Sequence, residues 1–181
     1  GRRVLTASLD CTARSWDPDS GACLQLFEQH RAALHSAAFS PCGALAVSGS
    51  ADGTARIWRL EGGAADVALV GHHGPVRQAA FSPNSFLAIT AGGDSLAIVW
   101  ISRTGEQLLT LEGHRGPVTS AAFSPDAQLA ITASSDKTAR VWSAESGACF
   151  RTFALHAGPL CSAAFHPRVQ KAPGRDAQQQ A

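Results

Sequence analysis

Three features of the sequence predict an all-β fold built from repeated units of four short strands. The stretch from Gly113 to Trp142 recurs along the chain, and its marker residues reappear every 42 residues, as His114 follows His72. Within each copy, short runs rich in Val, Ile, Leu, Thr and Ala alternate with turns rich in Gly, Pro and Asp, which is typical of strands. No segment keeps a long apolar period of about 3.6 residues, which argues against a helical repeat.

Four series of residues carry this repeat, with no insertion or deletion between copies. The series are His30, His72, His114 and His156; Asp10, Asp52, Asp94 and Asp136; Trp16, Trp58, Trp100 and Trp142; and the Phe-Ser-Pro steps at 39–41, 81–83 and 123–125, which become Phe-His-Pro at 165–167. A fixed period of this length is typical of solenoids, propellers and helical arrays, so the repeat is the unit of folding.

The first unit is expected to hold three strands. Val4–Leu9 and Thr12–Trp16 flank a short polar turn and predict a β-hairpin. The loop at 17–21 is rich in Asp, Pro and Gly, and the third run, Ala22–Phe27, follows it. This unit therefore lacks one strand of the full set.

From His30 onward the unit is complete. Its expected strands are Leu34–Phe39, Leu45–Ser50, Thr54–Trp58 and Asp66–Val70. The same order recurs from His72 to Leu111 and from His114 to Leu155, and one further run, Leu160–Phe165, follows His156. The sequence therefore predicts sixteen strands in total. Residues 168–181 are rich in Gln, Lys, Arg and Ala, and we expect a disordered polar tail there.

Four strands per unit, with Gly-His near one end and Trp-Asp near the other, resemble the WD-repeat β-propeller family. Gly-His is intact at Gly71-His72 and Gly113-His114, whereas Trp-Asp stands only at Trp16-Asp17. The resemblance extends over residues 4–167, so we assign residues 1–167 to a propeller fragment of three complete blades and two partial ones. We expect an open arc of a larger propeller that self-associates through its exposed edges, with remaining blades as partners. The alternative is a closed four-blade ring in which Leu160–Phe165 pairs with Val4–Leu9.

The recurring His, Ser or Thr, Asp and Trp could suggest a hydrolase triad, but a catalytic site would not be copied in every unit. The resemblance instead implies a buried structural hydrogen-bond chain in each blade. Its residues are Thr6, Asp10, Trp16, His30, Ser48, Asp52, Trp58, His72, Thr90, Asp94, Trp100, His114, Thr132, Asp136, Trp142 and His156.

Other recurring positions have simpler interpretations. The Ser-Pro steps are expected to form turns rather than phosphorylation sites, and Phe39, Phe81, Phe123 and Phe165 are expected in the core. The third repeat replaces the Arg of its siblings by Ile98 and a Thr by Leu96. We favour sequence drift that leaves a weaker blade, the alternative being an apolar surface that meets a neighbour.

Composition restricts the function and the compartment. The net charge of +1 gives no broad field for nucleic acid or membranes, and no apolar run reaches membrane-span length. The five cysteines show no metal-ligand spacing, and the recurring Cys23 and Cys149 are expected to be small buried residues. We therefore expect no cofactor and no metal, and an intracellular protein in the cytoplasm or the nucleus. The chain begins with Gly1-Arg2-Arg3, without Met, and looks cut from a longer one.

The expected function is a non-enzymatic scaffold for protein–protein interaction. Arg31, His73 and Arg115 follow the repeated His and could form a basic arc on one face that contacts a partner protein, whose identity the sequence does not specify. One alternative is the regulatory region of a larger protein such as a kinase or NTPase. Another is a ubiquitin-ligase substrate receptor, although Trp16-Asp17-Pro18-Asp19 lacks the Arg of the Trp-Asp-x-Arg motif.

Overall fold

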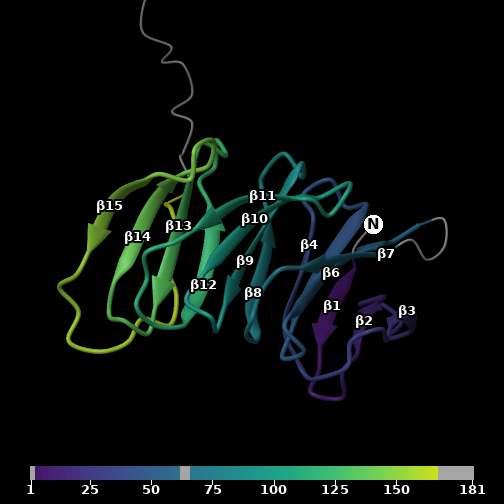
Figure 1. Ribbon diagram of the computed structural model, residues 1–181. Helices are drawn as coiled ribbons and strands as arrows, with labels where there is room; N and C mark the ends of the chain where they lie inside the picture. Colours follow the sequence, from purple (N-terminus) through teal and green to yellow (C-terminus); the bar gives the residue numbers. More distant parts are fainter. Residues whose placement is uncertain (1–2, 62–65, 167–181) are drawn as a thin grey trace, which may run out of the picture.

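The computed structural model describes residues 3–61 and 66–166, and in these residues the chain forms fifteen strands and no helix. The strands make four antiparallel sheets, which we call blades 1 to 4 and which follow one another in an open arc (Figure 1). Nothing in the described ranges is a helix long or apolar enough to cross a membrane. The predicted all-β architecture is therefore confirmed, and the tail at 168–181 lies outside the described residues.

Each blade is a meander of neighbouring strands. Blade 1 consists of β1 (Val4–Ala7), β2 (Ala13–Trp16) and β3 (Cys23–Phe27). Blade 2 consists of β4 (Leu34–Phe39), β5 (Leu45–Ser50), β6 (Thr54–Arg59) and β7 (Asp66–Val70). Blade 3 consists of β8 (Val76–Phe81), β9 (Leu87–Gly92), β10 (Ala97–Ile101) and β11 (Gln107–Leu111). Blade 4 consists of β12 (Val118–Phe123), β13 (Leu129–Ser134), β14 (Ala139–Ser143) and β15 (Cys149–Phe153).

The core lies between consecutive blades rather than inside any one of them. Ile57 and Leu69 of blade 2 share one buried cluster with Val76 and Trp100 of blade 3. Val99 of blade 3 and Trp142 of blade 4 share a second cluster with Val118. Each blade thus buries its apolar faces against its neighbours, which is how a repeat unit too small for its own core becomes stable.

The sixteenth predicted strand, Leu160–Phe165, does not form. The segment nevertheless occupies the position of an inner strand, because the Leu160 amide donates to the Ser134 carbonyl at 3.1 Å, as the Leu34 amide donates to Ser8 at 3.0 Å. The Thr119 hydroxyl also donates to the Leu160 carbonyl at 2.7 Å. A strand needs a ladder partner, and no described strand forms a backbone ladder with this segment.

The arc is open, as expected. Leu160–Phe165 is not paired with β1, and the two segments lie at opposite ends of the molecule in Figure 1. The four-blade ring is therefore not the structure of this chain.

Two predictions about burial need correction. Cys23 and Cys149 are exposed, because they begin the outermost strands β3 and β15, which have no neighbour on their outer side. Phe81 and Phe123 are buried as predicted, whereas Phe39 and Phe165 are only half-buried. Phe39 packs against the cluster shared with the three-stranded blade 1, and Phe165 belongs to a segment that pairs with no described strand.

Candidate functional site

A chain of hydrogen bonds crosses each complete blade from the tryptophan to the turn aspartate. In blade 4, the Trp142 indole Nε1–H donates to the Thr132 hydroxyl at 2.8 Å. That hydroxyl lies 2.7 Å from His114 Nε2, and His114 Nδ1 lies 2.9 Å from an oxygen of Asp136. Each group thus meets a partner on both sides, which satisfies polar groups that would be costly to bury alone.

The same chain recurs in blades 2 and 3 with nearly equal distances. Trp58 donates to Ser48 at 2.8 Å and Trp100 to Thr90 at 2.8 Å. The corresponding histidines, His30 and His72, join these hydroxyls to the carboxylates of Asp52 and Asp94 at 2.9 and 3.0 Å. The constancy of the geometry follows from the constant spacing of the repeat.

The two partial units hold only pieces of this chain. In blade 1, Trp16 donates to Thr6 at 2.9 Å, and Asp10 accepts a hydrogen bond from the Thr12 hydroxyl at 2.7 Å without a histidine between them. His156 is exposed, and its ring makes no hydrogen bond to any described residue. The structure therefore brings together three of the expected sets in full.

The protonation states of the histidines and aspartates determine which group donates in each hydrogen bond. Burial lowers the pKa of His114, although Asp136 opposes this, and the same holds for His30 and His72 with their aspartates. Burial would raise the pKa of Asp136, but the Thr138 hydroxyl, the Arg115 amide and His114 together hold it well below its usual range. A neutral imidazole thus donates from Nδ1 to a carboxylate and accepts at Nε2 from the hydroxyl, which in turn accepts from the indole.

This order of groups matches that of a hydrolase triad, but the hydroxyl cannot act as a nucleophile. The side chains of Ser48, Thr90 and Thr132 are completely buried, with 0% exposure. Each hydroxyl also accepts the indole N–H of its own blade. A nucleophile must reach a substrate carbonyl, so these groups are placed for structure rather than for acyl transfer.

The turn aspartates also hold the backbone of the three residues of the expected arc. The amides of Arg31, His73 and Arg115 donate to Asp52, Asp94 and Asp136 at 2.9, 2.8 and 2.9 Å. All three side chains are exposed. They lie at equivalent positions of blades 2, 3 and 4, on the edge where the outer strand of one blade leads into the inner strand of the next. We call this edge the histidine edge.

One exposed cation of the histidine edge was missed by the sequence analysis. Lys137 lies in the turn between β13 and β14 with φ of 71°, in the left-handed region. The equivalent residues are Cys11, Gly53 and Ser95, and these also have positive φ. A charged residue at a turn position that its siblings give to small residues is the signal that could have revealed it.

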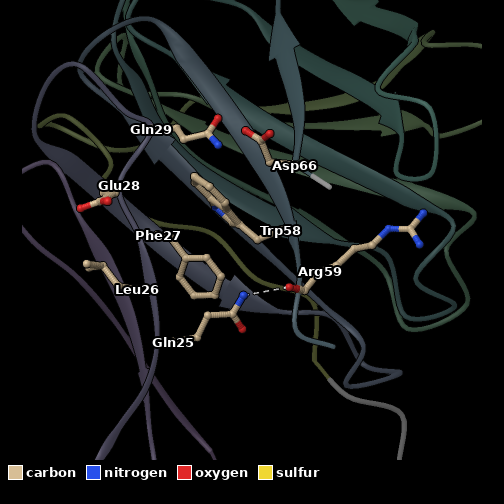
Figure 2. A pocket seen from close by; sticks show the side chains of 8 residues that line it. All are labelled: Gln25, Leu26, Phe27, Glu28, Gln29, Trp58, Arg59 and Asp66. Atoms are coloured by element: carbon tan, nitrogen blue, oxygen red, sulfur yellow. Dashed lines mark hydrogen bonds between the residues drawn. The ribbon is translucent and has the colours of Figure 1, made fainter. Parts of the chain in front are cut away.

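A small cavity opens between blades 1 and 2 (Figure 2). Its volume is about 200 Å³, and it is lined by Gln25, Leu26, Phe27, Glu28, Gln29, Trp58, Arg59 and Asp66. Phe27 and Trp58 pack with ring centroids 5.1 Å apart, and the Gln25 side chain donates to the Arg59 carbonyl at 3.1 Å. Asp66 is held by an ion pair with Arg56. The volume is below the range of about 300–1,000 Å³ that is usual for ligand sites, so this cavity is a packing feature.

The Ser-Pro steps lie in turns. The Ser40 hydroxyl accepts the Leu45 amide at 3.0 Å and Ser124 accepts the Leu129 amide at 2.9 Å, and both serines are buried. A buried hydroxyl that closes a turn is a poor acceptor for phosphate. Among the described residues, no group of three or more His, Cys, Asp or Glu is arranged to hold a metal ion.

Comparison with known families identifies the repeat. The model of the WD domain, G-beta repeat, matches residues 21–59, 66–100 and 105–143, which together make up more than half of the chain. This chain belongs to the WD-repeat family. Each matched range ends at the blade's tryptophan or one residue after it, so the matches follow the hydrogen-bonded blades described above.

A curated relative supports the same assignment. WD repeat-containing protein 25 from Mus musculus is 45% identical over 47 residues, which are 25% of this chain and 9% of that protein. The chain thus matches only a small part of this relative. WD repeats generally serve as platforms on which other proteins assemble and are generally non-catalytic.

Proposed function

We propose that this chain is a non-enzymatic scaffold whose partner protein binds the histidine edge at Arg31, His73 and Arg115. The observation that carries the proposal is the hydrogen bond from each of these backbone amides to a partly buried turn aspartate. The backbone from which these three exposed side chains project is thereby held at evenly repeated positions on successive blades. A rigid array of this kind lowers the entropy cost of binding.

Charge supports an acidic partner. Arg31 and Arg115 are exposed and form no ion pair with a described residue, and Lys137 adds a third lysine or arginine cation on the same edge. Exposed cations of this kind steer an acidic protein toward the edge and contribute more to association rate and specificity than to affinity.

Charge reversal tests this proposal. Arg31→Glu with Arg115→Glu should reduce the capture of acidic proteins from a cell extract at low salt, where exposed charges act most strongly. Arg151→Glu, at an exposed position on β15, is the matched control and should leave capture unchanged. Equal capture by the double variant and the unsubstituted chain at low salt, with an unchanged circular dichroism spectrum, would exclude the histidine edge as the contact.

The same proposal places the chain inside the cell, without nucleic acid or membrane as a partner. Five free cysteines, four of them exposed, support a reducing compartment. We also propose that further blades join the two open edges. Blade 1 lacks the innermost of the four strands present in blades 2 and 3, and Leu160–Phe165 stands at an innermost position without the three strands that would follow it in its unit. Unpaired strand edges invite pairing.

A further inference from the structure

A groove of about 760 Å³ separates blades 2 and 3 on the edge opposite the histidine edge. Apolar side chains from both blades make most of its wall. These include Leu45, Ile57 and Val67 from blade 2, and Phe86, Leu87 and Leu108 from blade 3. Its size lies within the range of about 300–1,000 Å³ that ligand pockets occupy.

Two of the apolar side chains are exposed to water. Phe86 is 73% exposed and Leu108 is 47% exposed. The blade fold does not require an aromatic residue at this position, because the residues 42 positions before and after Phe86 are Ala44 and Gln128. An exposed aromatic side chain beside a preformed apolar groove is a typical anchor for a partner.

The groove is also cationic. Arg59 and Arg103 line it, and no Asp or Glu is among the described residues of its wall. Neither guanidinium forms an ion pair with a described residue, and in Figure 2 the Arg59 side chain extends away from the small cavity beside Trp58. Both charges are therefore available to a ligand.

The repeat provides an internal comparison for these charges. The residues 42 positions before Arg59 and Arg103 are Asp17 and Glu61. The residues 42 positions after them are Ile101 and Glu145. The pair of cations is thus specific to the junction of blades 2 and 3, and blade folding alone does not explain it.

A buried polar group points to the same junction. Ser102 lines the groove, is 3% exposed, and its hydroxyl has no hydrogen-bond partner among the described residues. The equivalent residues are the apolar Leu60 and Ala144. An unsatisfied buried hydroxyl destabilises the free protein, and a ligand that supplies a hydrogen bond removes this cost.

We propose that this groove binds a short acidic segment of a partner protein. One large apolar side chain of the segment packs against Phe86 and Leu108, and flanking carboxylates pair with Arg59 and Arg103. The combination of an apolar wall with only two cations fits a peptide better than a nucleic acid, whose binding depends on many phosphate contacts. The site is separate from the histidine edge and adds a second contact surface to the scaffold.

The test uses the whole chain and a fluorescein-labelled peptide that has a central Leu-Phe pair flanked by Asp and Glu. Fluorescence anisotropy should show saturable binding that weakens as salt is raised. Arg59→Glu with Arg103→Glu should weaken binding by about tenfold or more, and Phe86→Gln should do so by about tenfold. Arg31→Glu, on the opposite edge, should change the affinity by less than about twofold.

A second readout uses the cysteines. Cys42 lines the groove, and the hydrogen bond with Ser40 lowers the pKa of its thiol. The peptide should slow alkylation of Cys42 by iodoacetamide, whereas Cys149, which is exposed on β15, should react at an unchanged rate.

Several outcomes would overturn the proposal. These are no saturable binding below about 1 mM, equal affinity of the doubly reversed variant, and equal binding of a matched peptide with Lys in place of Asp and Glu. Protection of Cys42 that increases with protein concentration in the absence of peptide would show instead that a second copy of the chain occupies the groove. By contrast, a variant that loses capture at the histidine edge but still binds the peptide would agree with the proposal, because it shows that the groove and the scaffold contact are separate sites.

Discussion

Blades 3 and 4 have the same hydrogen-bond chain but use different side chains beside its tryptophan. In blade 4, the Arg140 guanidinium lies over the Trp142 ring, 5.9 Å from its centroid, and remains half-buried. In blade 3, Ile98 takes the equivalent place, is 1% exposed, and packs with Leu69 of blade 2 and with Trp100. The same position is therefore a partly solvated cation in one blade and a core residue in the other.

This comparison changes the interpretation of the third repeat. Ile98 belongs to the buried cluster that joins blades 2 and 3. It therefore contacts the neighbouring blade, which agrees with the alternative of an apolar contact surface and not with the favoured interpretation of sequence drift. Leu96 has the opposite effect, because it removes the hydroxyl that Thr138 donates to Asp136 at 2.6 Å in blade 4. Blade 3 thus has fewer polar contacts at its turn and more apolar contact with blade 2. The hydrogen-bond chain is the constant part of a blade, and the residue beside the tryptophan adapts to the neighbouring blade.

The largest expected effect on stability comes from exchanging the residues beside the tryptophans of blades 3 and 4, which are Ile98 and Arg140. Ile98→Arg should lower the free energy of unfolding by about 3 kcal/mol, because it forces a charge into a fully covered position. Arg140→Ile should change it by less than about 1 kcal/mol, since only a partly exposed cation–π contact is lost. Urea unfolding followed by tryptophan fluorescence measures both values. Equal losses for the two variants would contradict the difference between the blades.

A smaller effect is expected from the turn aspartates. Asp136→Ala should destabilise the chain by about 1–3 kcal/mol, because it leaves His114, the Thr138 hydroxyl and two amides without an acceptor. Asp94→Ala should cost less, because Leu96 provides an amide at 3.2 Å but no hydroxyl. Thermal unfolding of both variants tests the order. An unchanged midpoint for Asp136→Ala together with loss of partner binding would instead assign the aspartate to a functional site.

The smallest effect expected from a single titrating group is the dependence of the free energy of unfolding on pH, which blades 3 and 4 share. His72 and His114 have pKa values below the ordinary 6.5, so below that pH the folded chain binds fewer protons than the unfolded chain. The free energy of unfolding should therefore fall as the pH drops below 6.5, by at most about 1.4 kcal/mol per pH unit for each imidazole. The turn aspartates, with lowered pKa values, extend the loss below pH 3.8.

Unfolding curves between pH 7.5 and 5 check this dependence. His72→Gln and His114→Gln should each flatten it by a similar amount, because each removes one imidazole and the two are similarly buried. A stability that is constant over this range, or that rises as the pH falls, would show that the imidazoles are charged in the folded chain.

The sequence by itself determined the features that repeat. Strand positions such as Leu34–Phe39, Leu45–Ser50 and Asp66–Val70 were predicted with the bounds that the structure has, and other ends differ by one or two residues. The His, hydroxyl, Asp and Trp that the family resemblance assigned to each unit form the expected hydrogen-bond chain in blades 2, 3 and 4, whereas the two partial units hold only pieces of it. These features depend on alternation, turn chemistry and spacing within one unit, and the constant period of 42 residues makes each copy check the others.

Only the tertiary structure decided what depends on a neighbour. Leu160–Phe165 has the composition of a strand but has no ladder partner, and the recurring Cys23 and Cys149 face solvent because no strand covers them. The burial of Ile98 and the meeting of Arg59, Phe86 and Arg103 in one groove likewise arise from the packing of two blades. Hydrogen-bond pairing and burial are non-local: they depend on which surfaces lie side by side, and a repeat pattern does not contain that information.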